Sequence, residues 1–164
     1  MTSQEHDNLS SLGVKWFKRQ GFPVVATEIN AAGSREQADV VAFRSSCSAI
    51  IEVKVSRPDF IADRNKPERQ VDGAGLGVYR FYLCPAGLIL PEELPSRWGL
   101  LYAEIGKVVE VIKPQGNIWP ALECSVGGWS EFQHAPDIET ERSVLFSITR
   151  RLVRGEPILK HQRT

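Results

Sequence analysis

The sequence predicts an α/β fold of the α+β type, in which helices pack on one central mixed β-sheet. Apolar residues recur at helical spacing near both ends of the chain, which favours two amphipathic helices. Between them lie short runs rich in β-branched and aromatic residues, separated by glycine, proline and polar residues, as strands usually are. The length of 164 residues is sufficient for one domain with a buried core.

The first expected element is an amphipathic helix from about Asp7 to Gln20, which ends at Gly21. Its apolar residues at helical spacing are Leu9, Leu12, Trp16 and Phe17. The apolar run Pro23–Ile29 follows and is expected to form the first strand.

Three further strands are expected over Asp39–Phe43, Ser48–Val55 and Val78–Cys84. Only a short polar link joins the first two of these runs, so they are expected to pair as a hairpin. A short helix over Arg57–Lys66 separates the last two, because Pro58 suits a helix start and Pro67 stops the helix.

Two more strands, over residues 98–105 and 107–113, are expected at the edge of the sheet. Residues 114–136 are rich in glycine, proline, tryptophan and polar side chains, which is typical of an irregular arm.

The last helix is expected from Ile138 to about Arg154, with Asp137 as its N-cap. Acidic residues early in this helix and arginines late in it complement the helix dipole. Its expected apolar stripe comprises Val144, Leu145, Ile148 and Leu152. We therefore expect a core over residues 1–113. The arm, the helix and a basic tail over residues 114–164 are expected to pack on the same single domain.

The bulk composition excludes several classes of protein. Lys plus Arg and Asp plus Glu number 20 each, so net charge gives no argument for a nucleic-acid or membrane partner. The three cysteines are far apart and form no CxxC pair, which argues against a disulfide framework and fits a reducing compartment. The polar N-terminus is unlike a secretory signal, and no apolar run is long enough to cross a bilayer. We therefore expect a cytoplasmic protein.

The third predicted strand places an acid and a base inside a β-branched run. Because side chains alternate along a strand, Glu52 and Lys54 are expected on one face and the neighbouring apolar residues on the other. Asp39 begins the preceding strand, so hairpin pairing would bring its carboxylate near Glu52. The three charges are therefore expected to form one cluster.

Such a cluster has a recognisable chemistry. Two neighbouring carboxylates raise each other's pKa unless a cation lies between them. Mg²⁺ binds a few carboxylates together with waters, and a lysine beside it can stabilise charge that develops on a phosphate. An Asp followed one strand later by Glu-x-Lys therefore favours metal-assisted phosphodiester hydrolysis, although Glu-x-Lys alone also occurs as a surface ion pair.

The combination resembles the PD-(D/E)xK nuclease superfamily, which has the restriction-endonuclease-like fold. Asp39 and the triplet Glu52-Val53-Lys54 match the motif of this family, with alanine in place of the usual proline before the aspartate. The wider stretch, from TEIN through QADVVAF to IIEVKVSRPDFIADRNKP, is similar to small MmcB-like DNA-repair proteins and related phage and mobile-element proteins. The resemblance covers roughly Leu9–Lys113 and leaves the last third unmatched.

The resemblance implies a metal-dependent DNA endonuclease or nickase, active in DNA repair, recombination or phage and mobile-element DNA processing. Asp39, Glu52 and the backbone carbonyl of Val53 would bind Mg²⁺, for which Mn²⁺ would substitute. Lys54 would be the catalytic lysine. Glu28, expected inside the preceding strand, would be a further acidic residue of the site, and a surface acid is the alternative for it.

DNA would be the partner, contacted by basic residues near the motif. The candidates are Arg35, Arg57, Arg64, Lys66 and Arg69. A mixed-charge helix exposed to solvent is the alternative for the segment after the motif. Glu5 and Asp7 are further acidic candidates, because some relatives place a glutamate on the first helix. The histidines, His6, His134 and His161, lack metal-ligand spacing and are expected at the surface.

Two other functions remain open at this point. One is a catalytically silent DNA-binding or repair-assembly module on the same fold, although such a module has no need for three charges on one face. The other is an RNA nuclease. The sequence also leaves open the substrate structure (duplex, branched or single-stranded), the number of metal ions and the formation of a homodimer.

Overall fold

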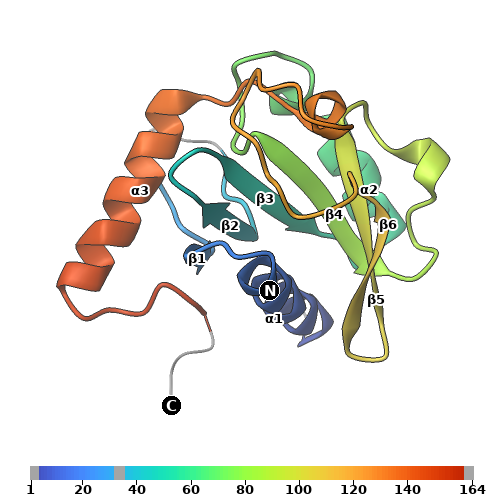
Figure 1. Cartoon of the computed structure of the whole chain (residues 1–164). Coiled ribbons are helices and arrows are strands. Elements are labelled where there is room, and N and C mark those ends of the chain that lie inside the picture. The colour runs from blue at the N-terminus through green and yellow to red at the C-terminus, as the bar shows by residue number, and fades with distance from the viewer. Residues whose placement is uncertain (1–3, 32–35, 161–164) are drawn as a thin grey trace.

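A six-stranded mixed β-sheet lies at the centre of the computed structural model, which describes residues 4–31 and 36–160 (Figure 1). The strands are β1 (Val24–Thr27), β2 (Val40–Phe43), β3 (Ser48–Val53), β4 (Tyr79–Pro85), β5 (Trp98–Glu104) and β6 (Lys107–Ile112). The α-helices are α1 (Gln4–Arg19), α2 (Arg57–Arg64) and α3 (Ile138–Val153). Short 3₁₀ turns are η1 (Pro67–Arg69), η2 (Pro91–Glu93) and η3 (Trp129–Phe132). The predicted α/β fold with a mixed sheet is therefore confirmed.

The strands follow one another across the sheet in chain order. β1, β2 and β3 are antiparallel, β3, β4 and β5 are parallel, and β6 returns antiparallel to β5. A parallel pair needs a crossover, and α2 lies in the one between β3 and β4. In the predicted hairpin Val40 pairs with Ile51. Asp39 and Glu52, the next residues along each strand, therefore lie at the same end of that hairpin.

The two faces of the sheet carry separate apolar clusters. On one face Ile51 belongs to a cluster with Trp16 of α1. On the other face Ile50 belongs to a cluster with Phe60 of α2 and Val144 of α3. Because side chains alternate along β3, Glu52 lies on the face of Ile50, which α2 covers.

α1 lies close against the sheet because one of its residues has no side chain. A Cβ atom on Gly13 would be 3.1 Å from Ile51 Cδ1, tighter than ordinary packing allows. Gly21 adopts φ +89° and ends the helix region, as predicted. The helix begins at Gln4 rather than Asp7, with acidic residues in its first turn and basic residues in its last.

Three predicted elements end earlier than expected. β1 ends at Thr27 because Glu28 adopts a left-handed backbone conformation with φ +50°, so placing Glu28 inside the strand was wrong. β3 ends at Val53, although the Lys54 N–H still donates to a carbonyl of β4 at 2.9 Å. α2 ends at Arg64 because Lys66 precedes a proline and is extended, with ψ 144°.

Residues 114–136 form the irregular segment that the composition predicts, and they pack on the face covered by α1. Trp119 and Trp129 are almost completely buried in the cluster of that face. Their rings lie 4.9 Å apart, and Trp119 also meets Trp16 edge-on at 5.9 Å. These tryptophans are therefore packing residues of the hydrophobic core.

α3 lies at the margin of the fold, beside β1 and β2 (Figure 1). Asp137 caps it as predicted, because its side chain accepts a hydrogen bond from the Thr140 N–H. The predicted apolar stripe is only partly correct. Val144 and Ile148 are buried against the sheet, whereas Leu145 and Leu152 are exposed.

None of the helices in residues 4–31 and 36–160 has the length and apolar character needed to span a membrane. Cys47, Cys84 and Cys124 are all free thiols, as their spacing indicated.

Candidate active site

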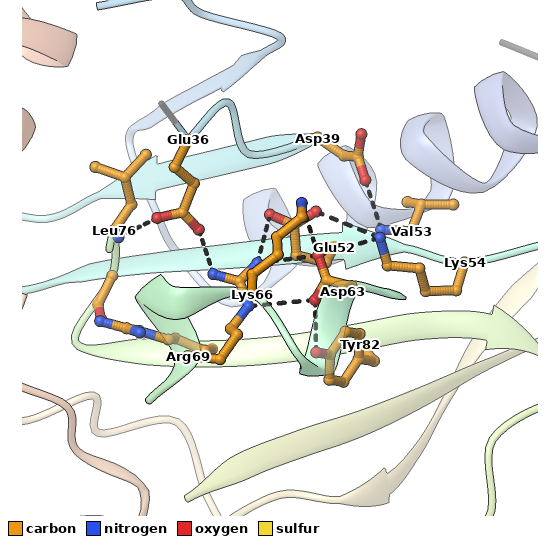
Figure 2. Close-up of polar contacts among 12 residues, drawn as sticks. Glu36, Asp39, Glu52, Val53, Lys54, Asp63, Lys66, Arg69, Leu76 and Tyr82 are labelled. Carbon is orange, nitrogen blue, oxygen red and sulfur yellow. Dashed lines mark hydrogen bonds and ion pairs between the residues drawn. The ribbon is translucent and has the colours of Figure 1, made fainter. Parts of the chain in front are cut away.

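The β2–β3 hairpin brings two of the predicted acids together at one end of the sheet. The Val53 N–H donates a hydrogen bond of 2.7 Å to Asp39 Oδ2, which holds this carboxylate beside β3 (Figure 2). Glu52 is only 4% exposed. The predicted approach of Asp39 to Glu52 is therefore present in the fold.

The charge of Glu52 is incompletely compensated. Burial, followed by the negative charge of Asp39, raises the pKa of Glu52 well above its usual value. Lys54 Nζ lies 4.0 Å from Glu52 Oε2, and Arg69 Nη2 lies 3.4 Å from Oε1. Both distances exceed the 2.7–2.9 Å or so of a charge-assisted hydrogen bond. An additional cation between Asp39 and Glu52 would therefore stabilise both carboxylates.

Lys54 lies on the same face as Glu52, as strand alternation predicted, but its nearer partner is Asp63. Lys54 Nζ is 3.3 Å from Asp63 Oδ1, against 4.0 Å from Glu52. Lys54 is therefore held between an acid of β3 and an acid of α2.

Asp63 is the centre of a group of charges near the end of α2, which we call the Asp63 cluster (Asp63, Arg69, Lys66 and Glu36; Figure 2). Lys66 Nζ lies 3.1 Å from Asp63, Arg69 donates to both carboxylate oxygens at 3.2 Å, and the Tyr82 hydroxyl donates at 2.6 Å. Burial alone would raise the pKa of Asp63. Arg69, Lys54 and the Tyr82 hydroxyl outweigh burial and hold that pKa well below its usual range.

Arg69 is not available to DNA, which corrects its prediction as a phosphate contact. Its side chain has no exposed surface. It forms ion pairs with Glu36 at 2.6 Å, Asp63 at 3.2 Å and Glu52 at 3.4 Å, and it lies over the Trp98 ring. Burial would lower the pKa of Arg69, but the three carboxylates raise it above its usual value. Arg69 therefore serves as the internal counter-charge of the site.

Helix α1 contributes a histidine that sequence reasoning placed at the surface. His6 is half-buried, and its Nε2 lies 3.2 Å from Asp39 Oδ1. The hydrogen bond to Asp39 raises the pKa of His6 in spite of partial burial. His134 is also half-buried, and burial lowers its pKa to about 3. The surface prediction is therefore wrong for both, and His161 lies outside the described residues.

Glu28 lies beside the site, but its carboxylate is engaged elsewhere. Its N–H donates to the Asp39 carbonyl at 3.3 Å. Lys160 Nζ lies 3.3 Å from Glu28 and 2.8 Å from Asp7, so two acidic candidates share one lysine from the far end of the chain. Glu5, the remaining acidic candidate of α1, is exposed.

The other predicted DNA contacts differ in how firmly they are held. Arg57 forms a bidentate ion pair with Glu93, with both N–O distances at 2.6 Å. Arg64 lies over the Phe60 ring at 5.6 Å, and Lys66 is exposed although it pairs with Asp63. Arg35 lies outside the described residues. Arg64 and Lys66 are therefore the candidates that remain accessible near the site.

The donor set fits Mg²⁺ in its chemistry. Asp39 and Glu52 offer the hard carboxylate oxygens that this ion prefers, and Mg²⁺ usually keeps several waters as further ligands. Among residues 4–31 and 36–160, no group of three or more His, Cys, Asp or Glu side chains is arranged as a metal site.

Sequence reasoning gave no site role to three residues that shape the site. Glu36 and Asp63 bracket Arg69, and Glu36 also accepts a hydrogen bond from the Leu76 N–H at 2.9 Å. Glu36 lies only three positions before Asp39, but an isolated acid in a loop carries no signal of burial. Tyr82 pairs with Glu52 across the parallel strands β3 and β4. Tyr82 lies in an apolar strand, where an aromatic residue usually serves packing, and its hydroxyl bond to Asp63 depends on tertiary structure.

Comparison with known proteins identifies a fold neighbour. No family model and no curated protein matches the chain. A solved structure of a protein of unknown function from Silicibacter pomeroyi is similar, with a TM-score of 0.59 and 22% sequence identity. The match covers 96% of this chain and 99% of that one. At this identity the likeness shows a shared fold.

Proposed function

We propose that the protein is a metal-dependent DNA endonuclease or nickase that hydrolyses phosphodiester bonds, in DNA repair, recombination or mobile-element DNA processing. The observation that carries this proposal is the approach of Asp39, Glu52 and Lys54 at one end of the β2–β3 hairpin. The raised pKa of Glu52 supports it, because a carboxylate in need of a counter-charge is suited to bind a metal ion. The resemblance to PD-(D/E)xK nucleases rests on the same residues.

Each residue has a role in this proposal. Asp39 and Glu52 would hold Mg²⁺ together with the Val53 carbonyl, and the bound ion would supply Lewis acidity and an activated water. The Val53 N–H orients Asp39. Lys54 would place its positive charge beside the phosphate, where negative charge develops during hydrolysis.

Asp63 and the basic residues around it would support this chemistry. The Asp63 carboxylate, ionised at neutral pH because its pKa is well below the usual range, holds the Lys54 ammonium 3.3 Å away. Arg64 and Lys66, near the end of α2, would contact phosphates next to the cleaved bond.

A catalytically silent DNA-binding or repair-assembly module is the second candidate function, and one observation favours it. Lys54 is closer to Asp63 than to Glu52, and Arg69 already pairs with Glu52. A site whose charges partly compensate one another can persist in a protein that performs no turnover.

Cleavage assays test the leading proposal. We expect the protein to cut at least one of single-stranded, nicked, branched or duplex DNA in Mg²⁺ or Mn²⁺. Asp39→Ala and Lys54→Ala should each lower the rate by about 10²–10⁴-fold. Asp59→Ala is the matched control, because Asp59 is an exposed acid on α2. Absence of cutting, or cutting that survives both active-site substitutions, would contradict the proposal, and faster cutting of RNA would reassign the substrate.

Metal titration by calorimetry separates the two candidates. We expect Mg²⁺ or Mn²⁺ to bind the wild-type protein at millimolar concentration and Glu52→Gln to lose that binding. No binding to the wild-type protein, together with retained DNA binding, would favour the silent module.

A further inference from the structure

The exposed side of α3 carries a row of large apolar residues. These residues are Ile138, Leu145, Phe146, Leu152 and Val153. Phe146 is 64% exposed and Val153 is 83% exposed, so they contribute little to the core. Single exposed apolar residues are ordinary, but five on one side of a helix, with Arg142 and Thr149 between them, are typical of an interaction surface.

The spacing of these residues places them on one stripe. Ile138, Leu145 and Leu152 are seven positions apart, and so are Phe146 and Val153. Seven residues make nearly two helical turns, so both sets run along the same side of α3. We call these five residues the α3 stripe. The residues that α3 buries, Glu141, Val144 and Ile148, lie on the adjacent side, next to Leu145 and Leu152.

α3 is also accessible in the fold. It lies at the margin beside β1 and β2, far from the β5–β6 hairpin (Figure 1). Within residues 4–31 and 36–160, it is attached mainly through Val144, Ile148 and the hydrogen bond from the Ser48 hydroxyl to Glu141. The stripe is therefore open to a partner without any rearrangement of the sheet.

The charges on α3 indicate what that partner is. Glu139 lies in the first turn and Arg150 in the last, and both are exposed. In the part of the chain that the structure describes, neither forms an ion pair, and Arg150 lies over the Phe146 ring at 5.7 Å. A parallel second copy would bring like charges together. An antiparallel second copy would place Glu139 near Arg150 at both ends.

The stripe is also symmetric about its own centre. The midpoint of α3 falls between Leu145 and Phe146. A two-fold axis at this point would place Ile138 opposite Val153 of the second copy. Glu139 would then lie within about half a turn of Arg150 of the second copy, and both residues lie on the same flank of the stripe. A two-fold dimer requires a self-complementary surface of this kind.

We propose that α3 is the interface of a homodimer, in which two copies of this chain pack their α3 stripes against each other in antiparallel orientation. Apolar burial would provide the affinity, and the two Glu139–Arg150 pairs would set the orientation. One pair of short helices buries less than a standard interface of roughly 1,200–2,000 Å², so a dissociation constant of about micromolar order is expected. The inference is independent of the proposed nuclease activity.

Sedimentation velocity over a range from about 0.1 μM to 100 μM tests the interface, since this range brackets that affinity. We expect the wild-type protein to change from monomer to dimer as its concentration rises, and Phe146→Asp to remain a monomer. Ile105→Asp is the matched control, because Ile105 is a fully exposed apolar residue in the β5–β6 turn and should leave the dimer unchanged. Circular dichroism establishes that each variant is folded.

A charge exchange tests the orientation. Glu139→Arg or Arg150→Glu alone should weaken the dimer by about tenfold, and the double variant should restore it, because two exposed pairs turn repulsive and then attractive again. The proposal is overturned by a wild-type protein that stays monomeric, by a Phe146→Asp variant that still dimerises, or by a double variant no stronger than the single ones. A monomer that uses the arginines of α3 to bind DNA would overturn it as well.

Discussion

Two buried acids lie close together near α2, and their charges are balanced in opposite ways. Asp63 accepts a hydrogen bond from Tyr82 and has three cations within 3.3 Å, so its pKa is well below the usual range. Glu52 has its nearest cations at 3.4 Å and 4.0 Å and Asp39 as a like-charged neighbour, so its pKa is well above the usual range. Both side chains are buried. The opposite pKa shifts of the two acids therefore come from the charged and hydrogen-bonding groups around each carboxylate.

This difference separates charges that support the fold from charges that support chemistry. A carboxylate of the first kind has its counter-charges within the chain, and its removal leaves cations unpaired. A carboxylate of the second kind lacks sufficient counter-charge within the chain. Its ionised form is stabilised only when an external cation binds beside it. Asp63 belongs to the first kind, and we infer that Glu52 belongs to the second.

The largest expected effect is the loss of the Asp63 charge. Asp63→Asn should destabilise the protein by about 3–5 kcal/mol, because the buried Arg69 and the nearby lysines lose their shared counter-charge. Urea denaturation measures this change. Asp59→Asn on the same helix is the control and should cost less than about 1 kcal/mol, since Asp59 is exposed and interacts mainly with the helix dipole. Equal effects of the two substitutions would show that the cluster does not support the fold.

The contrast between Asp63 and Glu52 also predicts how the stability of the fold depends on pH. The folded-state pKa of Asp63 is lowered, so its stabilising contribution is complete above the unfolded value of about 3.9 and is lost as the pH falls below it. The stability of the wild-type protein should therefore fall more steeply between about pH 4 and pH 2 than that of Asp63→Asn. Urea denaturation at several pH values checks this, and parallel curves would contradict it.

A smaller effect of opposite sign is expected at Glu52. Its folded-state pKa is raised, so its ionised form destabilises the protein above the unfolded value of about 4.3. Glu52→Gln should therefore stabilise the metal-free protein at pH 7 by about 1 kcal/mol, which raises the Tm by about 2–4 °C. This gain should vanish below about pH 4, where the glutamate is protonated in both states.

Calorimetric melting of the metal-free protein measures the change at Glu52. Destabilisation by Glu52→Gln at pH 7 would show that Arg69 and Lys54 fully compensate this acid and would remove the distinction from Asp63. If Glu52→Gln stabilises the protein and also abolishes DNA cleavage, the distinction between Glu52 and Asp63 is strengthened. Functional sites often lower the stability of the fold, because they are built to bind an external charge.

Local rules of the sequence were sufficient for part of this site. Strand alternation predicted that Glu52 and Lys54 share a face, and the short link of the hairpin predicted the approach of Asp39. Both features depend on residues close together in the chain. Hydrophobic runs and turn signals were likewise sufficient for the order of the strands along the chain.

The same rules could not reveal the counter-charges. Arg69 looked like an exposed basic residue because its partners Glu36, Glu52 and Asp63 come from a loop, a strand and a helix, which only tertiary packing brings together. Lys160 reaches Glu28 from the opposite end of the sequence. No periodic pattern in the sequence predicts such contacts.

The smallest expected effect concerns the basic residues that remain near the site. Arg64→Ala should lower the affinity for DNA by less than about fivefold and reduce the slope of log affinity against log salt by about 1, as the loss of one phosphate contact does. Arg57→Ala should change that slope less, because Glu93 already holds the Arg57 guanidinium through two hydrogen bonds. Fluorescence anisotropy with a labelled duplex at several salt concentrations measures both slopes. If Arg57→Ala has the larger effect, the ion pair with Glu93 opens when DNA binds, and Arg57 joins the contacts that position the phosphate.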